Sequence, residues 1–138
     1  MCTTNSCRSQ IAEALMRHFY GNKFDAFSAG AVATSIHPLT EKVMRELGID
    51  ISKQKSKSIK EFFGLDFDYV ITLCGENAKA VCPVFTGKAN VRLNWNFEDP
   101  AEAKGKEKEV IGVFRRVRDE IKTKIDEFVK GLEKEMAI

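Results

Sequence analysis

Segments with helical and strand patterns alternate along this chain, and that order constrains the fold more than any other feature. The helical segments carry apolar residues three and four positions apart, whereas the strand segments are short and rich in aromatic and β-branched residues. We expect helices over residues 9–20, 38–47 and 107–135, a short helix capped by Ser56 or Ser58, and strands over residues 24–28, 67–73 and 89–94. Such alternation favours an α/β fold with an open parallel sheet flanked by helices, in which ligands bind beyond the carboxyl ends of the strands.

Composition narrows the possible functions. The 138 residues are enough for one domain with a full core, which we expect to span residues 1–138. A net charge of +2 gives no electrostatic reason to expect nucleic-acid or membrane binding, and no apolar run reaches the ~18 residues that span a bilayer. Because the chain is polar from Thr3 onward, it has no signal-peptide pattern, and we expect a cytoplasmic protein.

The chain has four cysteines: Cys2, Cys7, Cys74 and Cys82. In the cytoplasm such residues rarely form structural disulfides. Their spacing lacks the paired C-x2-C pattern of a zinc site, and the two histidines complete no ligand set. We therefore expect neither a metal nor a cofactor, and we favour nucleophilic or redox use of the thiols.

The start of the chain has the pattern of a loop that wraps a tetrahedral oxyanion. Cys2 and Arg8 stand just before an amphipathic helix that begins near Ser9, and the residues between them are Thr3, Thr4, Asn5, Ser6 and Cys7. Backbone N–H groups of the loop can point inward, and Arg8 can close the ring with two donors while Cys2 lies beneath the bound central atom. The positive end of the helix dipole favours the thiolate of Cys2. The alternative is a buried, inert Cys2 with Arg8 on a solvated face.

The loop poses a problem for the sheet. A cysteine loop that leads into a helix normally follows a buried central strand, yet only Met1 precedes Cys2. We therefore expect a sheet that lacks its usual first strand. An upstream start, another segment or a second chain could fill the place, so we expect either a monomer or a dimer that shares a strand.

Asp99 follows the second predicted strand of the carboxyl half and precedes Pro100. Proline restricts the residue before it to extended conformations, so the carboxylate can be held toward a leaving oxygen as a general acid. The alternative is that Asp99 only opens an Asp-Pro turn.

Cys74 directly follows the strand at 67–73, and Cys82 comes after seven intervening residues. Both thiols could simply be buried on a loop. With Cys2 on the same rim, however, three thiols suggest a relay. In such a relay a thiolate attacks an acceptor, a second thiol resolves the adduct, and a third takes over the disulfide.

Several blocks of the chain extend these observations: Cys2–Gln10, Ser28–Gly30, Gly48–Ser52, Val70–Cys74, Cys82–Pro83, Phe97–Pro100 and Arg116–Ile121. In composition and order they resemble the thioredoxin-coupled arsenate reductases, which share the low-molecular-weight tyrosine phosphatase fold. The resemblance covers nearly the whole chain, and it implies a flavodoxin-like strand order and the reduction of arsenate to arsenite.

The resemblance also implies roles for residues of the loop. Cys2 would attack arsenate, and Arg8 with the loop amides of residues 3–9 would bind the oxyanion. Ser9 would orient the thiolate, Asn5 would hold the shape of the loop, and Cys7 would have no redox role.

Outside the loop, the resemblance implies that Asp99 protonates the departing oxygen. Cys74 would attack the adduct on Cys2, release arsenite and leave a Cys2–Cys74 disulfide. Cys82 would then displace Cys2, and thioredoxin would reduce the Cys74–Cys82 pair. In this chain the last two cysteines are one residue further apart than is usual in the family.

Some members of the family bind potassium beside the loop through residues that match Asn5, Glu13 and Ser28, together with an acidic residue. Lys57 stands at the acidic position here, so we expect no such site.

Two alternatives to arsenate reduction stay open. A low-molecular-weight protein tyrosine phosphatase would use Cys2 alone through a phosphocysteine, but such enzymes generally have an aromatic residue after Asp-Pro, where this chain has Ala101. The second alternative is an inactive remnant that only binds an oxyanion.

Overall fold

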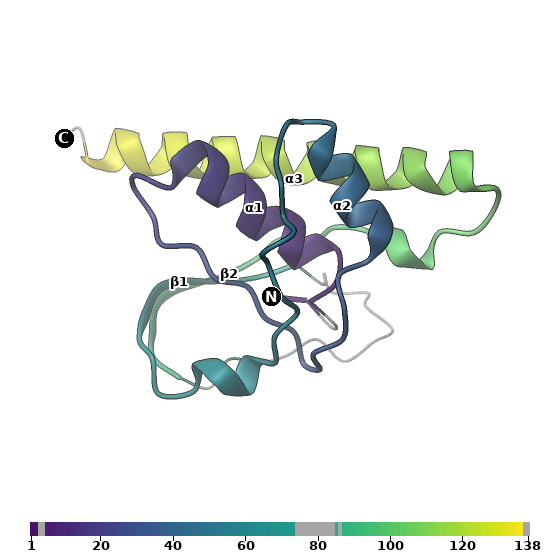
Figure 1. Ribbon diagram of the computed structural model, residues 1–138. Helices are drawn as coiled ribbons and strands as arrows, with labels where there is room; N and C mark the ends of the chain where they lie inside the picture. Colours follow the sequence, from purple (N-terminus) through teal and green to yellow (C-terminus); the bar gives the residue numbers. More distant parts are fainter. Residues whose placement is uncertain (3–4, 74–84, 86, 137–138) are drawn as a thin grey trace.

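The computed structural model describes residues 1–2, 5–73, 85 and 87–136. In chain order it contains helix α1 (Arg8–Tyr20), helix α2 (Pro38–Arg45), 3-10 helix η1 (Ile59–Phe62), strand β1 (Phe67–Thr72), strand β2 (Ala89–Asn94), 3-10 helix η2 (Pro100–Glu102) and helix α3 (Glu107–Met136) (Figure 1). The predicted helices and the two carboxyl-half strands are confirmed, with ends that differ by a few residues. Ser58, one of two predicted caps, precedes η1.

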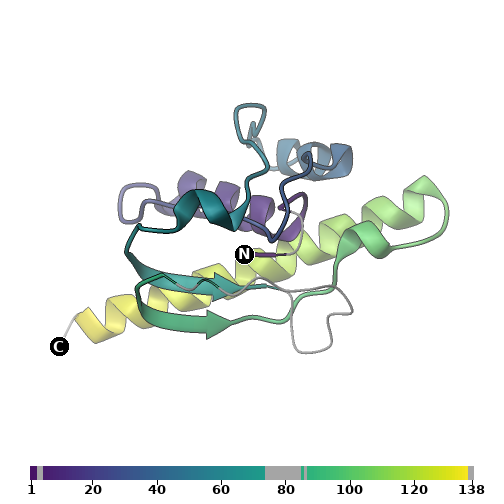
Figure 2. The same ribbon diagram turned by 90° about the horizontal axis from the view of Figure 1, so that it is seen from below.

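Strands β1 and β2 pair in parallel, with Phe67 opposite Ala89 and Thr72 opposite Asn94. Helices α1 and α2 both pack on the long helix α3, and the three helices lie on one side of the paired strands (Figures 1 and 2). This arrangement confirms the predicted α/β class with a parallel sheet flanked by helices. Of the helices described, none is long and apolar enough to cross a membrane.

The main core lies between α1, the strands and α3. Helix α3 contributes apolar side chains spaced three and four residues apart, as its sequence pattern predicts. Those buried in this core are Val117, Ile121, Ile125 and Val129. Ile111 and Phe114, nearer the start of α3, are buried in a second cluster with Cys7 and Val43. Phe19, an apolar residue of α1, is 44% exposed, and the Nζ of Lys122 lies 4.9 Å from the centre of its ring.

The first two residues occupy the position of a strand end. The Met1 ammonium donates a hydrogen bond to the Ile71 carbonyl at 2.6 Å, and the Leu73 N–H donates to the Met1 carbonyl at 2.8 Å. On the other side, Cys2 forms an isolated parallel bridge with Gly30. Met1 and Cys2 therefore lie between β1 and the segment that ends at Gly30.

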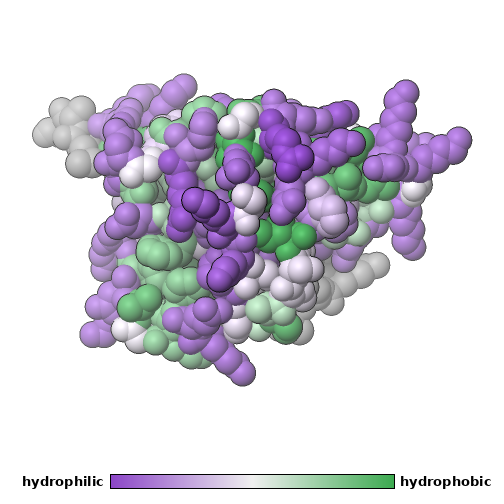
Figure 3. Space-filling model, viewed as in Figure 1, coloured by the Kyte–Doolittle hydropathy of each residue, from purple (hydrophilic) through white to green (hydrophobic). Residues whose placement is uncertain are grey.

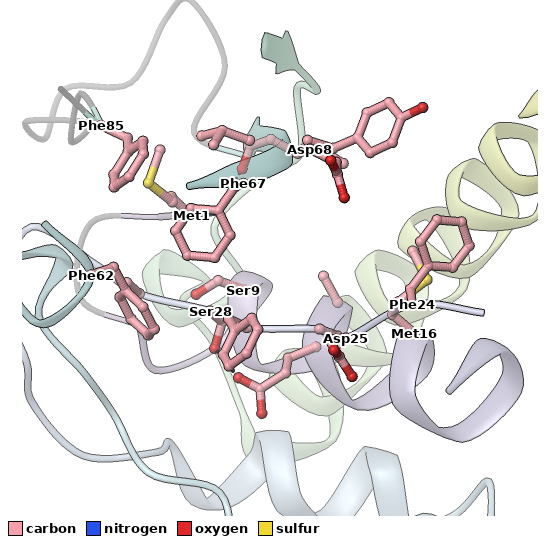
Figure 4. A pocket seen from close by; sticks show the side chains of 18 of the residues that line it. Met1, Ser9, Met16, Phe24, Asp25, Ser28, Phe62, Phe67, Asp68 and Phe85 are labelled. Atoms are coloured by element: carbon pink, nitrogen blue, oxygen red, sulfur yellow. Dashed lines mark hydrogen bonds between the residues drawn. The ribbon is translucent and has the colours of Figure 1, made fainter. Parts of the chain in front are cut away.

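The predicted strand over residues 24–28 is wrong, because these residues carry no strand ladder. A cavity of about 670 Å³ lies between them and β1 instead, and it is lined mainly by apolar side chains. Figure 4 shows Phe62, Phe67 and Phe85 around it, beside Met1.

Hydrophobic side chains reach the surface near this cavity. Phe27, Phe63 and Leu65 are about half exposed, and Figure 3 shows hydrophobic residues gathered on the part of the surface formed by η1 and the start of β1. Most of the rest of this face is hydrophilic.

Candidate active site

Cys2 is buried at the start of the loop that leads into α1. Its Sγ lies 2.8 Å from the Ser9 hydroxyl in the first turn of that helix. The Asn5 amide donates to the same hydroxyl oxygen at 2.7 Å. Because the oxygen already accepts this hydrogen bond, the Ser9 hydroxyl hydrogen is free to point at the sulfur. Such a donor stabilises a thiolate.

Asn5 holds the loop from inside. Its backbone φ is 53°, a left-handed conformation that asparagine tolerates better than most residues. Its Oδ1 accepts from the Lys57 N–H at 2.8 Å and from Gln10 Nε2 at 2.7 Å. A backbone N–H can only donate, so this contact fixes the orientation of the amide and turns Nδ2 toward Ser9 and Ser28.

Arg8 is the first residue of α1, and its side chain is buried rather than solvated. One guanidinium nitrogen donates to the carbonyls of Leu73 and Phe97 at 3.3 and 3.0 Å. The other lies 3.6 Å from Asp99 Oδ2. Arg8 therefore connects the loop to the carboxyl end of β1 and to the segment after β2, as expected for a site at this edge of a parallel sheet.

Asp99 opens the turn that an Asp-Pro pair predicts, and its second carboxylate oxygen faces Arg8. Its Oδ1 accepts from the Ala101 N–H at 3.0 Å and caps η2, which begins at Pro100. Its Oδ2 faces Arg8, and the side chain stays 28% exposed. The carboxylate is thus oriented from two sides and open to solvent.

Ser6 and Cys7 anchor the loop to the core. The Ser6 carbonyl accepts from the His37 N–H and from the Thr40 hydroxyl, each at 3.1 Å. Cys7 packs with Val43 and Phe114. Burial raises the pKa of the Cys7 thiol to about 11, so this sulfur is a neutral thiol at physiological pH.

The predicted site residues Thr3, Thr4, Cys74 and Cys82 lie outside the described residues. The residue before Cys74 is described: Leu73 is buried and its carbonyl accepts from Arg8. Strand β1 therefore ends beside the loop. The structure brings Cys2 into contact with Ser9, and Arg8 close to Asp99, at this edge of the sheet.

Sequence reasoning missed the role of Gln10 and Gln54. Gln10 is fully buried, donates to Asn5 and to the Lys55 carbonyl, and accepts from Gln54 Nε2 at 2.7 Å. The available signal was a glutamine within the apolar stripe of α1, because a buried polar side chain needs partners.

A potassium ion does not fit the residues present. Asn5, Glu13 and Ser28 do lie together, but the Lys57 ammonium faces the Glu13 carboxylate at 3.5 Å. The Asn5 oxygen is turned away toward Lys57 N–H. Within the described parts of the chain, no group of three or more His, Cys, Asp or Glu side chains could hold a metal ion.

The fold and the cysteine–arginine loop at the start of α1 together define a phosphatase-like α/β protein. A family model for the low molecular weight phosphotyrosine protein phosphatases matches residues 1–138. The chain belongs to this family.

Its relatives are more specific. An arsenate reductase from Halalkalibacterium halodurans is 45% identical over 130 residues, which cover 94% of this chain and 92% of that protein. A solved arsenate reductase in the phosphate binding state has a TM-score of 0.77 at 33% identity and covers 94% of this chain and 93% of that one. A thioredoxin-dependent arsenate reductase from Corynebacterium glutamicum has a TM-score of 0.63 at 33% identity, over 97% of this chain and 60% of that one. The resemblance to arsenate reductases with this fold is confirmed.

Proposed function

We propose that this protein reduces arsenate to arsenite through a thiol relay that begins at Cys2. The observation that carries the proposal is the placement of the Cys2 sulfur 2.8 Å from the Ser9 hydroxyl, at the edge of the sheet where the Arg8 guanidinium meets Asp99. The relatives named above support the choice of arsenate as the oxyanion, and the neighbour in its phosphate binding state supports a tetrahedral oxyanion as ligand.

In the first step the Cys2 thiolate attacks arsenic and forms an S–As bond. One As–O bond breaks, and the departing oxygen leaves as water after it takes a proton from Asp99. Arg8 can turn two donors toward the remaining oxygens. The contact between Arg8 and Asp99 keeps the acid next to the bound oxyanion.

In the second step the Cys74 thiolate attacks the Cys2 sulfur. The electron pair of the S–As bond stays on arsenic, which is reduced from As(V) to As(III) and leaves as arsenite, while Cys2 and Cys74 form a disulfide. Cys82 then attacks Cys74 and frees Cys2. A dithiol of the thioredoxin type supplies two electrons to reduce the Cys74–Cys82 disulfide, so two thiols are oxidised for each arsenate.

The thiol count separates this chemistry from phosphate ester hydrolysis. Hydrolysis needs one nucleophile and water, so Cys74 and Cys82 would have no chemical role in it. Reduction of arsenic by two electrons needs a second thiol that can reach Cys2. The residue before Cys74 in the chain, Leu73, is buried, and its carbonyl accepts from Arg8.

The test is arsenite release in the presence of thioredoxin, thioredoxin reductase and NADPH. We expect multiple turnovers for the native protein and a single turnover for Cys82→Ser. Cys7→Ser is the matched control, because Cys7 is a buried thiol outside the relay, and it should keep multiple turnovers. Full multiple-turnover activity of Cys82→Ser would contradict the proposed relay.

The second candidate is a protein tyrosine phosphatase, favoured by the family to which the chain belongs. Fast hydrolysis of an aryl phosphate that is unchanged in a Cys74→Ser/Cys82→Ser double variant would establish it. A protein that binds phosphate but turns over neither arsenate nor an aryl phosphate would be the inactive remnant.

A further inference from the structure

Glu13 places a carboxylate inside the protein, one helical turn after Ser9. Its side chain is 1% exposed, and the Ser28 hydroxyl donates to its Oε1 at 2.6 Å. A buried carboxylate is costly unless a positive charge and hydrogen bonds offset its loss of hydration. Two cations are near: Lys57 Nζ at 3.5 Å from Oε1 and Arg17 Nε at 3.7 Å from Oε2. Arg17 is 53% exposed and therefore screened by water, which leaves Lys57 as the principal counter-charge.

Lys57 is held in this position by three further contacts. Its Nζ donates to the Lys55 carbonyl at 2.6 Å. Its backbone N–H donates to Asn5 Oδ1 at 2.8 Å, and its carbonyl accepts from the Gly30 N–H at 2.9 Å. The ammonium is thus attached to a backbone that is fixed to the segment beside Cys2.

A continuous series of contacts joins this ammonium to the nucleophile. Glu13, which Lys57 contacts, accepts from the Ser28 hydroxyl. The Ser28 hydroxyl in turn accepts from Asn5 Nδ2 at 3.0 Å. The same Nδ2 donates to the Ser9 hydroxyl at 2.7 Å, and that hydroxyl contacts Cys2 Sγ at 2.8 Å. Lys57 therefore restrains both ends of the Asn5 amide, its oxygen directly and its nitrogen through Glu13 and Ser28.

The oxygens around Lys57 Nζ are of the kinds that bind a metal cation as ligands. They are the Glu13 carboxylate and the Lys55 carbonyl, both common ligands of hard cations. We propose that Lys57 is a positioning residue that takes the place of a monovalent cation, so that the loop around Cys2 keeps its conformation without potassium. The proposal concerns the same loop as the proposed function, but its test uses thermal unfolding and phosphate binding, neither of which depends on arsenate reduction.

The experiment compares the native protein with Lys57→Met and Lys57→Asp in potassium chloride and in choline chloride of equal ionic strength. The native protein should have the same Tm and the same phosphate affinity in both salts. Lys57→Met removes the ammonium and keeps the stem. In choline chloride its Tm should fall by roughly 5 °C, and its phosphate affinity should fall about tenfold, as expected when a buried acceptor loses its partner.

Lys57→Asp restores an acidic group beside Glu13 and should acquire a dependence on potassium. Ser9, Glu13 and Ser28 line the cavity next to β1, and Figure 4 shows Ser9 and Ser28 side by side there, so an ion can reach the carboxylate from this side. In Lys57→Asp, both the Tm and the phosphate affinity should be higher in potassium chloride than in choline chloride. This difference between the two salts should be several-fold larger than in any other variant.

Lys60→Met is the matched control, because Lys60 is an exposed lysine of η1 close by in the sequence, and it should behave as the native protein. Should Lys57→Met not fold, Glu13→Gln/Lys57→Met removes both charges and should recover a cooperative transition without a salt effect. The proposal is overturned if potassium raises the Tm of the native protein, or if Lys57→Met matches Lys60→Met in both salts. Loss of phosphate binding in the native protein would count against the proposed function only.

Discussion

At the scale of single residues, side-chain hydrogen bonds hold the loop that follows Cys2. Asn5 donates to two hydroxyls and accepts from a backbone N–H and a glutamine. All of these groups are in the interior, where each hydrogen bond is stronger and each lost partner costs more. Substitution of one polar residue in this network should therefore change the reactivity of the Cys2 sulfur.

Ser9→Ala tests this at the shortest distance. The substitution removes the hydroxyl that contacts Cys2 Sγ at 2.8 Å, and a hydrogen bond to a charged group contributes about 1.5–3 kcal/mol. In a Cys74→Ser/Cys82→Ser background, we expect the rate of Cys2 alkylation by iodoacetamide at neutral pH to fall about tenfold or more. Ser35→Ala, at an exposed serine, serves as the control. An unchanged alkylation rate in Ser9→Ala would show that Ser9 does not act on the sulfur.

Cys7 offers a second test, because burial raises the pKa of its thiol from 9.0 to about 11. The unfolded chain releases this proton at lower pH than the folded protein does, so the free energy of unfolding should fall as pH rises from 9 to 11. A shift of this size corresponds to roughly 2–3 kcal/mol. Urea unfolding of native protein and Cys7→Ala, under reducing conditions across this range, measures the difference. Equal slopes in the two proteins would contradict it.

At the scale of elements, local patterns determined what the sequence could predict. Helix α3 and strand β1 were predictable because their apolar periodicity is long or strong. The strand expected over residues 24–28 was not formed, because a strand needs a neighbour to pair with, and among the described residues no strand pairs with this segment.

The same distinction applies to the candidate site. Cys2, Arg8 and Asp99 could be placed together because loop spacing and strand ends carry that information. The network of Asn5 with Gln10 could not be predicted, since several of its partners come from segments more than forty residues away, among them Lys57 and the carbonyl of Lys55. Contacts of this kind depend on packing, which local sequence patterns do not encode.

Helix η1 offers a test at this scale. The Ser58 hydroxyl accepts from the Lys60 N–H at 3.3 Å, and the Glu61 carboxylate accepts from the Ser58 N–H at 3.2 Å, which together form a capping box. Ser58→Ala should lower the free energy of unfolding by about 1 kcal/mol. Ser58→Asp keeps an acceptor at the cap and should lose less. Equal losses for the two variants in urea unfolding would show that the cap contributes nothing.

At the scale of the whole molecule, the two sides of the sheet edge differ in how completely they are packed. The loop, the end of β1 and the start of η2 meet in a buried, hydrogen-bonded cluster around Arg8. Next to it, the cavity of about 670 Å³ between residues 24–29 and β1 is bounded by Met1. Met1 thus lies between this hydrogen-bonded cluster and the cavity, and its ammonium donates to the Ile71 carbonyl.

The pH dependence of stability should report this position of the terminus. Burial lowers the pKa of the Met1 ammonium from 8.0 to about 6, and Arg8 adds to the effect while Cys2 opposes it. The folded protein therefore releases this proton at lower pH than the unfolded chain does. The unfolded chain binds more protons between pH 6 and 8, so the free energy of unfolding should rise with pH across that window. The expected gain is at most about 2–3 kcal/mol.

Acetylation of the Met1 amine isolates the contribution of this group, because the acetylated terminus keeps an N–H donor for the Ile71 carbonyl but cannot take up a proton. All other ionisable groups are common to the two forms, so their contributions cancel when acetylated and free protein are compared by urea unfolding at pH 6 and pH 8. We expect the acetylated protein to be the more stable at pH 6 and the two to converge at pH 8. A constant difference at both values would mean that the terminal ammonium is hydrated in the folded protein, and that the strand position between Gly30 and β1 is open to water rather than closed by Met1.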